Sequence, residues 1–201
     1  MKTIFFLDVD TQRDFMLHGG ALYVPGAERM ISKLRRLFDF ARKNDLTVLS
    51  TMDAHIPGDP EFKQFPPHCV QGTEGQRKID DTLLARPLIL ENKPIDRNLM
   101  DVVRKHQQII VQKQTLDVFD NHVTEKLLRV LPPHAIVFGV TTEYCVKTVA
   151  LGLRRLGIKT AVVTDAVRAL APKSGDEAIE EMRKAGCEFI TVETLMGVHA
   201  A

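Results

Sequence analysis

The chain lacks an excess of either sign of charge, and it lacks a long apolar run. Its 27 basic residues nearly balance its 26 acidic residues, which leaves a formal net charge of +1. This balance gives no electrostatic reason to expect nucleic acid or an anionic membrane as a partner. The apolar part of the start MKTIFFLDVD is too short for a secretory signal or for a membrane span of about 20 residues. We therefore expect a cytoplasmic protein whose partner is a small molecule.

Cysteine is also scarce in this chain. It occurs only at Cys69, Cys145 and Cys187, and no two of these residues have CxxC spacing. An odd number of widely separated cysteines predicts free thiols in a reducing compartment rather than a disulfide framework.

What the chain does have is an alternation of apolar runs and helical patterns. Runs rich in β-branched residues predict buried strands at Thr3–Leu7, Leu46–Ser50, Gln108–Val111, Ala135–Val140, Lys159–Thr164 and Glu188–Val192. Periodic patterns predict helices at Ala27–Asn44, Asn98–His106, Asn121–Leu131, Glu143–Leu156 and Gly175–Ala185. This alternation predicts an α/β fold with an open, doubly wound, Rossmann-like and mostly parallel sheet flanked by helices. No linker divides the chain, so we expect a single domain over residues 1–201.

Polar and reactive residues follow five of the predicted strands. They are Asp8 and Asp10, Asp53 and His55, Lys113, Thr141, Thr142 and Cys145, and Asp165. Ligands of open α/β sheets bind outside the carboxyl ends of the strands. The long stretch over residues 53–84, rich in Pro, Gly and His, starts at the same edge, and a loop of this length favours a functional role. We therefore expect the functional site at this edge of the sheet.

The candidate nucleophile is Cys145. A free cysteine is most often a small buried apolar residue, and this stays the alternative interpretation. Cys145, however, lies in the first turn of a predicted helix, where unpaired N–H groups stabilise a thiolate. Asp10 alone is equally typical of a turn cap, and Lys113 alone of a solvated surface residue. Together they make a nucleophile, a carboxylate that accepts and returns the thiol proton, and an ammonium that lowers the thiol pKa.

A second group consists of Asp53, His55, Glu61 and His68. Asp53 and His55 are two residues apart, so on an extended segment their side chains point the same way. Two imidazoles with two carboxylates suit one divalent metal ion such as zinc, iron or manganese. The alternative is a polar surface loop with incidental histidines.

These residues resemble the nicotinamidase branch of the isochorismatase-like cysteine hydrolases. The resemblance runs in matching order from LDVDTQRDF to VVTDAVRAL, which is nearly the whole chain. It implies that Asp10, Lys113 and Cys145 are catalytic, with Cys145 in the strand-to-helix turn GVTTEYC. It also implies that Phe15 and Phe65 flank a bound substrate ring.

The resemblance further implies a cis peptide bond at Val140–Thr141. In that arrangement, the N–H groups of Thr141 and Cys145 point at one position and form an oxyanion hole.

The stretch DAH…E…FPPHC resembles the loop by which nicotinamidases hold a metal ion. The resemblance implies that Asp53, His55, Glu61 and His68 bind one divalent ion, which orients a pyridine ring through its nitrogen. The implied activity is hydrolysis of nicotinamide to nicotinate and ammonia through a thioester on Cys145. Resemblance also implies a homo-oligomer.

Three alternative functions stay open. A sibling amidohydrolase acting on a carbamoyl, ureido or other small amide would use the same thiol and would need no metal. A non-catalytic small-molecule-binding module on the same fold is an alternative of another class, because fold does not determine function. An ether hydrolase of the isochorismatase type would not need the cysteine. Metal content and thiol reactivity discriminate among these functions.

Overall fold

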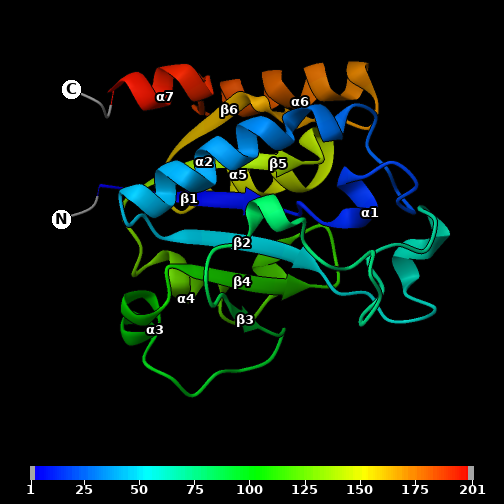
Figure 1. Cartoon of the computed structure of the whole chain (residues 1–201), viewed down its shortest axis with the longest axis horizontal. Helices are drawn as coiled ribbons and strands as arrows, with labels where there is room; N and C mark the ends of the chain where they lie inside the picture. The colour runs from blue at the N-terminus through cyan, green and yellow to red at the C-terminus, as the bar shows by residue number, and fades with distance from the viewer. Residues whose placement is uncertain (1–2, 199–201) are drawn as a thin grey trace.

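A parallel sheet of seven strands forms the centre of the molecule. A computed structural model describes residues 3–198 and contains strands β1 (Ile4–Val9), β2 (Val48–Asp53), β3 (Leu88–Leu90), β4 (Gln108–Lys113), β5 (His134–Val140), β6 (Lys159–Arg168) and β7 (Glu188–Ile190). Their order is β3-β4-β2-β1-β5-β6-β7, and all the paired neighbours run parallel (Figure 1). From β1 the chain builds one side of the sheet with β2, β3 and β4, where β4 lies between β2 and β3, and then the other side with β5, β6 and β7. The predicted α/β fold with an open, doubly wound sheet is confirmed.

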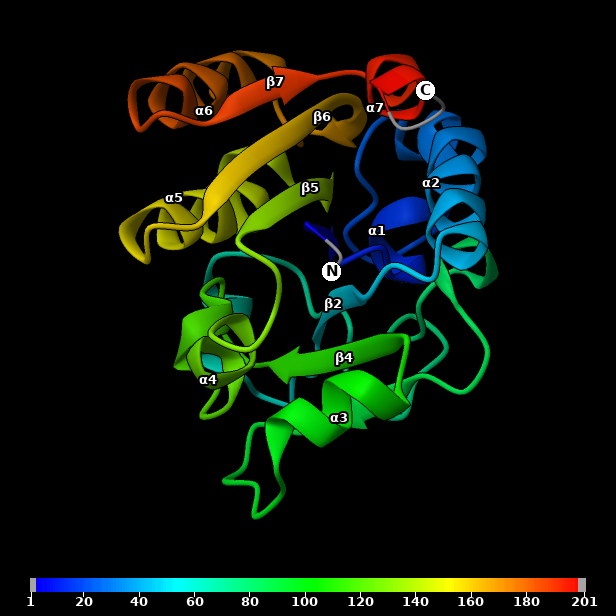
Figure 2. The ribbon, with the colours of Figure 1, turned by 90° about the vertical axis from the view of Figure 1, so that its left-hand side faces the viewer.

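Helices cover both faces of this sheet. They are α1 (Arg13–Met16), α2 (Ile31–Lys43), α3 (Leu99–Lys105), α4 (Thr124–Leu128), α5 (Lys147–Arg155), α6 (Pro172–Lys184) and α7 (Val192–Val198). Helices α1, α2 and α7 pack on one face and α3 to α6 on the other, each layer with its own apolar core (Figure 2). Across residues 3–198, no helix has the length and apolarity that a bilayer crossing requires.

The structure differs from the sequence prediction at several elements. Helices α1 and α7 were not predicted. Strand β3 was not predicted, because it has only three residues and its central Ile89 is 49% exposed at the sheet edge. The helix predicted from Asn121 begins only at Thr124, because the Asn121 amide donates to the carbonyl of Gln112 and its oxygen accepts the Val123 N–H. Strand β6 continues to Arg168 after a register shift opposite Gly139.

The segment between β2 and β3 begins beyond the carboxyl end of β2 (Figure 1). Backbone bonds attach it to the chain after β1: the Arg13 N–H donates to the carbonyl of Arg77, and the Ile79 N–H to that of Thr11. The carboxylate of Asp14 accepts the backbone N–H of Cys69 at 2.7 Å. These contacts position the segment over the carboxyl edge of the sheet.

Candidate active site

A lysine, two aspartates and a cysteine are buried together at the carboxyl ends of β1, β2, β4 and β5. Lys113, the last residue of β4, places its Nζ 3.0 Å from Asp10 Oδ2 and 3.5 Å from Cys145 Sγ. The same ammonium contacts Oδ1 of Asp53. Each of these four residues is 4% exposed or less. The structure thus brings together the three groups that the sequence analysis chose as nucleophile, proton carrier and ammonium.

Asp10 is held by a hydroxyl of the neighbouring strand. The residue follows β1 directly and has a left-handed backbone with φ of 46°, a conformation that a short polar side chain tolerates. The Thr51 hydroxyl donates to Asp10 Oδ1 at 2.6 Å and lies 3.2 Å from the Asp10 N–H, which donates to it. Because Oδ1 accepts the hydrogen bond from Thr51, Oδ2 is the oxygen that contacts Lys113. The sequence analysis missed Thr51; its signal is a threonine beside the predicted tip of an apolar strand.

Cys145 lies in a π-turn, Thr142–Val146, that connects β5 to α5. The carbonyl of Thr141 accepts the N–H of Tyr144 at 3.3 Å and that of Val146, five residues on, at 3.1 Å. The helix predicted to begin at Glu143 therefore begins as a wider turn, and regular α5 starts at Lys147. The Val140–Thr141 peptide bond is cis.

Burial dominates the electrostatics of the thiol. Lys113 acts to lower the pKa of Cys145, as the sequence analysis expected, but burial and the charges of Asp10 and Asp53 raise that pKa well above its ordinary value. Burial also raises the pKa of Asp10, against the opposing effect of Lys113. Although burial disfavours its ammonium, the two aspartates raise the pKa of Lys113 well above its usual value. The environment therefore favours a protonated thiol beside the Lys113 ammonium, and it increases the basicity of Asp10.

Two histidines and two carboxylates converge next to this group. His55 Nε2 lies 3.8 Å from Asp53 Oδ2 and 3.9 Å from Glu61 Oε1. His68 Nε2 lies 4.0 Å and 3.7 Å from the same two oxygens. Adjacent ligand atoms of a tetrahedral ion with bonds near 2.1 Å are about 3.4 Å apart. These four histidine–carboxylate distances are about 0.3 to 0.6 Å longer than that spacing, and the ligand atoms of Asp53, His55 and His68 lie within 4.8 Å of one another.

The outer nitrogens of both imidazoles are already engaged. His55 Nδ1 lies 3.0 Å from Asp59 Oδ2, and His68 Nδ1 lies 2.8 Å from the carbonyl of Pro66. Both ring nitrogens of His55 are buried, and neither makes a hydrogen bond within residues 3–198; the contact of Nδ1 with Asp59 is an ion pair. Burial disfavours the charged imidazole, yet Asp53, Asp59 and Glu61 raise the pKa of His55 to about 9. The orphaned, inward-facing Nε2 of His55 in this negative environment fits a divalent cation.

A narrow pocket connects the thiol to the histidines and carboxylates. Most of its wall is aromatic or apolar, from Phe15, Leu22, Phe65, Leu116, Tyr144 and Leu170. Asp53, Glu61 and His68 border it on one side, and Thr141 and Cys145 on another. The ring of Phe65 meets that of Tyr144 edge-on at 5.4 Å. The pocket is small and narrow, so it admits only a small ligand.

Comparison with known proteins identifies the family of this chain. Residues 5–194 match the isochorismatase domain model. The chain belongs to the isochorismatase family. It is 28% identical over 211 residues to a nicotinamidase of Escherichia coli (strain K12), with 92% of each chain covered. It is 29% identical over 195 residues to a nicotinamidase/pyrazinamidase of Mycobacterium tuberculosis, with 90% of this chain and 95% of that protein covered.

A solved structure of the same family has the same fold. The crystal structure of the pyrazinamidase of Pyrococcus horikoshii in complex with zinc matches with a TM-score of 0.77 at 25% identity. It covers 94% of this chain and 99% of that chain. Together with the curated relatives, this match confirms the resemblance to the nicotinamidase branch of the isochorismatase family.

Two of the polar residues predicted at strand ends do not join the site of this isochorismatase-family hydrolase. Asp8 lies within β1, and its Oδ2 is 2.9 Å from the ammonium of Lys78. Asp165 lies within β6, 2.9 Å from Lys33 of α2, and it accepts the N–H of Val192 at the start of α7. Both side chains point to the sheet face that α2 covers, because neighbouring residues of a strand alternate between faces.

Two further polar side chains that the sequence analysis did not single out support the converging histidines and carboxylates. The Gln12 amide donates to the carbonyl of Asp53 at 2.9 Å and accepts the Asp53 N–H at 2.7 Å. Asp59 engages His55 and also accepts the N–H of Glu61 at 3.0 Å. The available signals were the position of Gln12 within DVDTQRDF and the Asp59-Pro60 pair, which is typical of a turn start.

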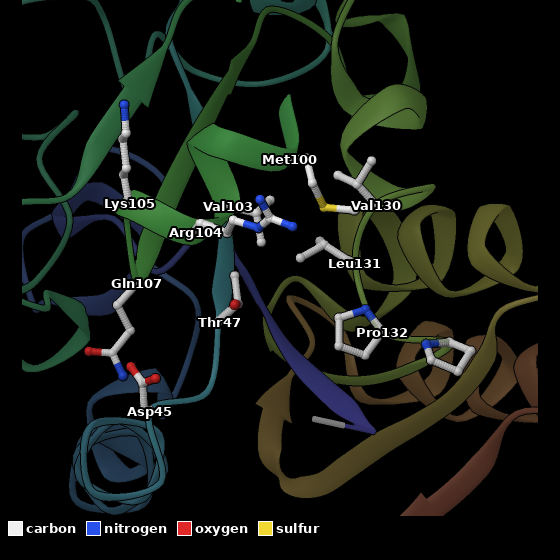
Figure 3. Close-up of a pocket in the computed structure, with 11 residues that line it drawn as sticks. Asp45, Thr47, Met100, Val103, Arg104, Lys105, Gln107, Val130, Leu131 and Pro132 are labelled. Atoms are coloured by element: carbon white, nitrogen blue, oxygen red, sulfur yellow. The ribbon is translucent and has the colours of Figure 1, made fainter. Parts of the chain in front are cut away.

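A wider groove lies at the opposite edge of the sheet, where the strands begin (Figure 3). It is bordered by Asp45 and Thr47 before β2, Gln107 before β4, and Pro133 before β5. Its lining contains none of the predicted site residues. The smaller pocket is therefore the candidate active site, because only that pocket joins a thiol to groups that can move protons and hold a cation.

Proposed function

We propose that this isochorismatase-family hydrolase is a metal-assisted nicotinamidase, which converts nicotinamide and water to nicotinate and ammonia. One observation carries the proposal: a single small pocket is bordered both by a buried thiol and by inward-facing histidine and carboxylate atoms. The similarity to the nicotinamidase of Escherichia coli and to the nicotinamidase/pyrazinamidase of Mycobacterium tuberculosis supports the same substrate.

The pocket wall suits a small planar ring. Phe15 and Phe65 flank the ring, and the other apolar side chains exclude water from it. Asp53, His55, Glu61 and His68 would hold one zinc, iron or manganese ion, which would supply a Lewis acid for the pyridine nitrogen. The rings of Phe15 and His68, 5.3 Å apart, keep the aromatic wall next to that nitrogen.

The first half of the reaction is attack by sulfur. Cys145 passes its thiol proton to Asp10, whose raised pKa favours acceptance, and the sulfur attacks the carboxamide carbon. The N–H groups of Thr141 and Cys145 stabilise the oxygen that becomes negative. Asp10 then returns the proton to the nitrogen, the C–N bond breaks, and ammonia leaves a thioester on Cys145. Lys113 stays an ammonium throughout and stabilises the carboxylate and the developing thiolate.

The second half is hydrolysis of the thioester. Asp10 accepts a proton from water as the water oxygen attacks the thioester carbon. The C–S bond then breaks, nicotinate leaves, and the proton on Asp10 returns to sulfur.

The sibling function, a metal-independent amidase for a carbamoyl or ureido acid, is less compatible with the pocket. Among residues 3–198, no arginine or lysine lines the pocket. Lys113 nearby is already paired with Asp10 and Asp53. A substrate carboxylate would face Asp53 and Glu61, which would repel it.

The test is ammonia release from four compounds: nicotinamide, pyrazinamide, benzamide and an N-carbamoyl amino acid. We expect turnover of the first two by protein loaded with metal, and loss of that turnover after chelation. Benzamide is the matched control, because it has the same shape without a ring nitrogen and should be a poor substrate. Full activity of metal-free protein on the carbamoyl compound would overturn the proposal in favour of the sibling function.

A further inference from the structure

Thr141 carries a polar group that the reaction described above leaves unused. The residue is 5% exposed and borders the pocket together with Cys145. Its side-chain oxygen Oγ1 is buried and has no hydrogen-bond partner among the residues that the structure describes. A buried hydroxyl without a partner is costly and uncommon in folded proteins. Its retention in a pocket wall indicates that a bound molecule supplies the missing partner.

Three other buried threonine hydroxyls near this edge of the sheet have hydrogen-bond partners. The Thr11 hydroxyl donates to Asp8, that of Thr51 donates to Asp10, and that of Thr82 donates to the carbonyl of Ile79. The lack of a partner is therefore specific to Thr141 within this set, and Thr141 is the member that borders the pocket.

We propose that the Thr141 hydroxyl accepts a hydrogen bond from the NH2 group of the substrate and so selects primary carboxamides over esters. The inference rests on the proposed function of the site. The carboxamide oxygen takes the N–H donors of Thr141 and Cys145, so the two N–H bonds of the amide nitrogen need separate acceptors. Asp10, which exchanges a proton with that nitrogen, serves one of them. The Thr141 hydroxyl is a neutral acceptor on the same residue as one of the oxygen-binding N–H groups, and it serves the other.

The experiment compares two substitutions on two matched substrates. Thr141→Val keeps the shape of the side chain and removes the hydroxyl, whereas Thr141→Ser keeps the hydroxyl. Nicotinamide has the N–H donors and methyl nicotinate lacks them. We expect Thr141→Val to lower kcat/KM for the amide about tenfold, the usual effect of leaving one buried hydrogen-bonding group unpaired. The ester should be unaffected, and Thr141→Ser should resemble the wild type on both substrates.

An equal loss on amide and ester with Thr141→Val, or no loss on either, would overturn the role of the hydroxyl. A binding measurement makes the test independent of turnover. In protein carrying Cys145→Ala, addition of Thr141→Val should weaken nicotinamide about tenfold and leave methyl nicotinate unchanged. Unchanged nicotinamide binding would also contradict the role.

Failure of the proposed function gives a different result. In that case the wild-type protein does not hydrolyse nicotinamide, and another amide in the panel is turned over. The Thr141 comparison then uses that amide and its methyl ester, with the same expected and contradicting outcomes.

Discussion

Two buried lysine–aspartate pairs lie on opposite faces of the same central strands, and their surroundings differ. Lys78 and Asp8 are 2.9 Å apart, and Lys113 and Asp10 are 3.0 Å apart. Asp8 also accepts the hydroxyls of Thr11 and Ser50, at 2.8 and 2.9 Å. Lys78 donates in addition to a backbone carbonyl of β2 at 3.2 Å. One positive charge thus meets one negative charge, and the neighbouring hydroxyls and carbonyl complete their hydrogen bonds.

The Lys113 pair is unbalanced. One ammonium faces the carboxylates of Asp10 and Asp53, with the sulfur of Cys145 at 3.5 Å and a pocket beside them. Burial, together with the charges of Asp10 and Asp53, raises the pKa of the thiol, and the excess of negative charge suits a cation on the far side of Asp53. The comparison teaches that a buried ion pair by itself is weak evidence of function. A buried ion pair that has an excess of one charge and lies beside a pocket is stronger evidence of a functional site.

The largest effect is expected where the unbalanced pair meets the sulfur. Cys145→Ala should reduce amide turnover by roughly 10⁴-fold or more, because no other group can form the thioester. The melting temperature should stay close to that of the wild type, since a methyl group replaces a small buried thiol. Ammonia release and thermal unfolding measure the two properties. Turnover near the wild-type level would contradict the role of Cys145 as the nucleophile beside the Lys113 pair.

The balanced pair should affect stability instead. Lys78→Met leaves Asp8 buried without its cation and should lower the free energy of unfolding by about 3–5 kcal/mol. Adding Asp8→Asn to the same chain should recover most of this loss, because neither buried charge then remains. Urea denaturation measures both variants. A well-folded Lys78→Met protein that has lost turnover would break the comparison and place Lys78 in the catalytic machinery.

Loss of the Asp59 contact that orients His55 should have a smaller effect, which is on metal binding. In Asp59→Asn the amide oxygen can still accept the N–H of Glu61, but its NH2 group cannot accept a proton from His55 Nδ1. Zinc affinity should fall about 10- to 100-fold, as is usual for the partner of a ligating histidine. Competition with a chelating dye measures it. Asp117→Asn is the matched control, because Asp117 accepts the Phe119 N–H at a similar 3-10 turn and should leave the affinity unchanged.

The smallest expected effect is a shift in the pH dependence of the thiol. Asp10 raises the pKa of Cys145 by its charge and by a hydrogen bond, so Asp10→Asn should lower that pKa. The rate of iodoacetamide labelling at Cys145, followed by mass spectrometry across pH, should then rise at a lower pH than in the wild type. The double variant Asp8→Asn/Lys78→Met, on the other sheet face, should leave the profile unchanged. An upward shift with Asp10→Asn would contradict the charge balance inferred for the site.

Much of the architecture could be predicted from local pattern. Continuous apolar runs alternating with helical periodicity predicted six of the strands, because strands buried on both faces leave few polar positions. The position of a polar residue directly after such a run predicted that Asp10, Lys113 and Cys145 would meet. Strand β3 escaped because a three-residue edge strand carries almost no periodic signal.

By itself, the sequence determined which residues stand at the carboxyl ends of parallel strands, and hence which chemical groups share one edge. Only the tertiary structure decided which sheet face each of them joins: Asp8 and Asp165 turn toward α2, whereas Asp10 and Asp53 turn toward Lys113. The tertiary structure also decided that the pKa of Cys145 is raised rather than lowered. Burial and the number of surrounding charges set that pKa, and both depend on packing between segments far apart in the chain.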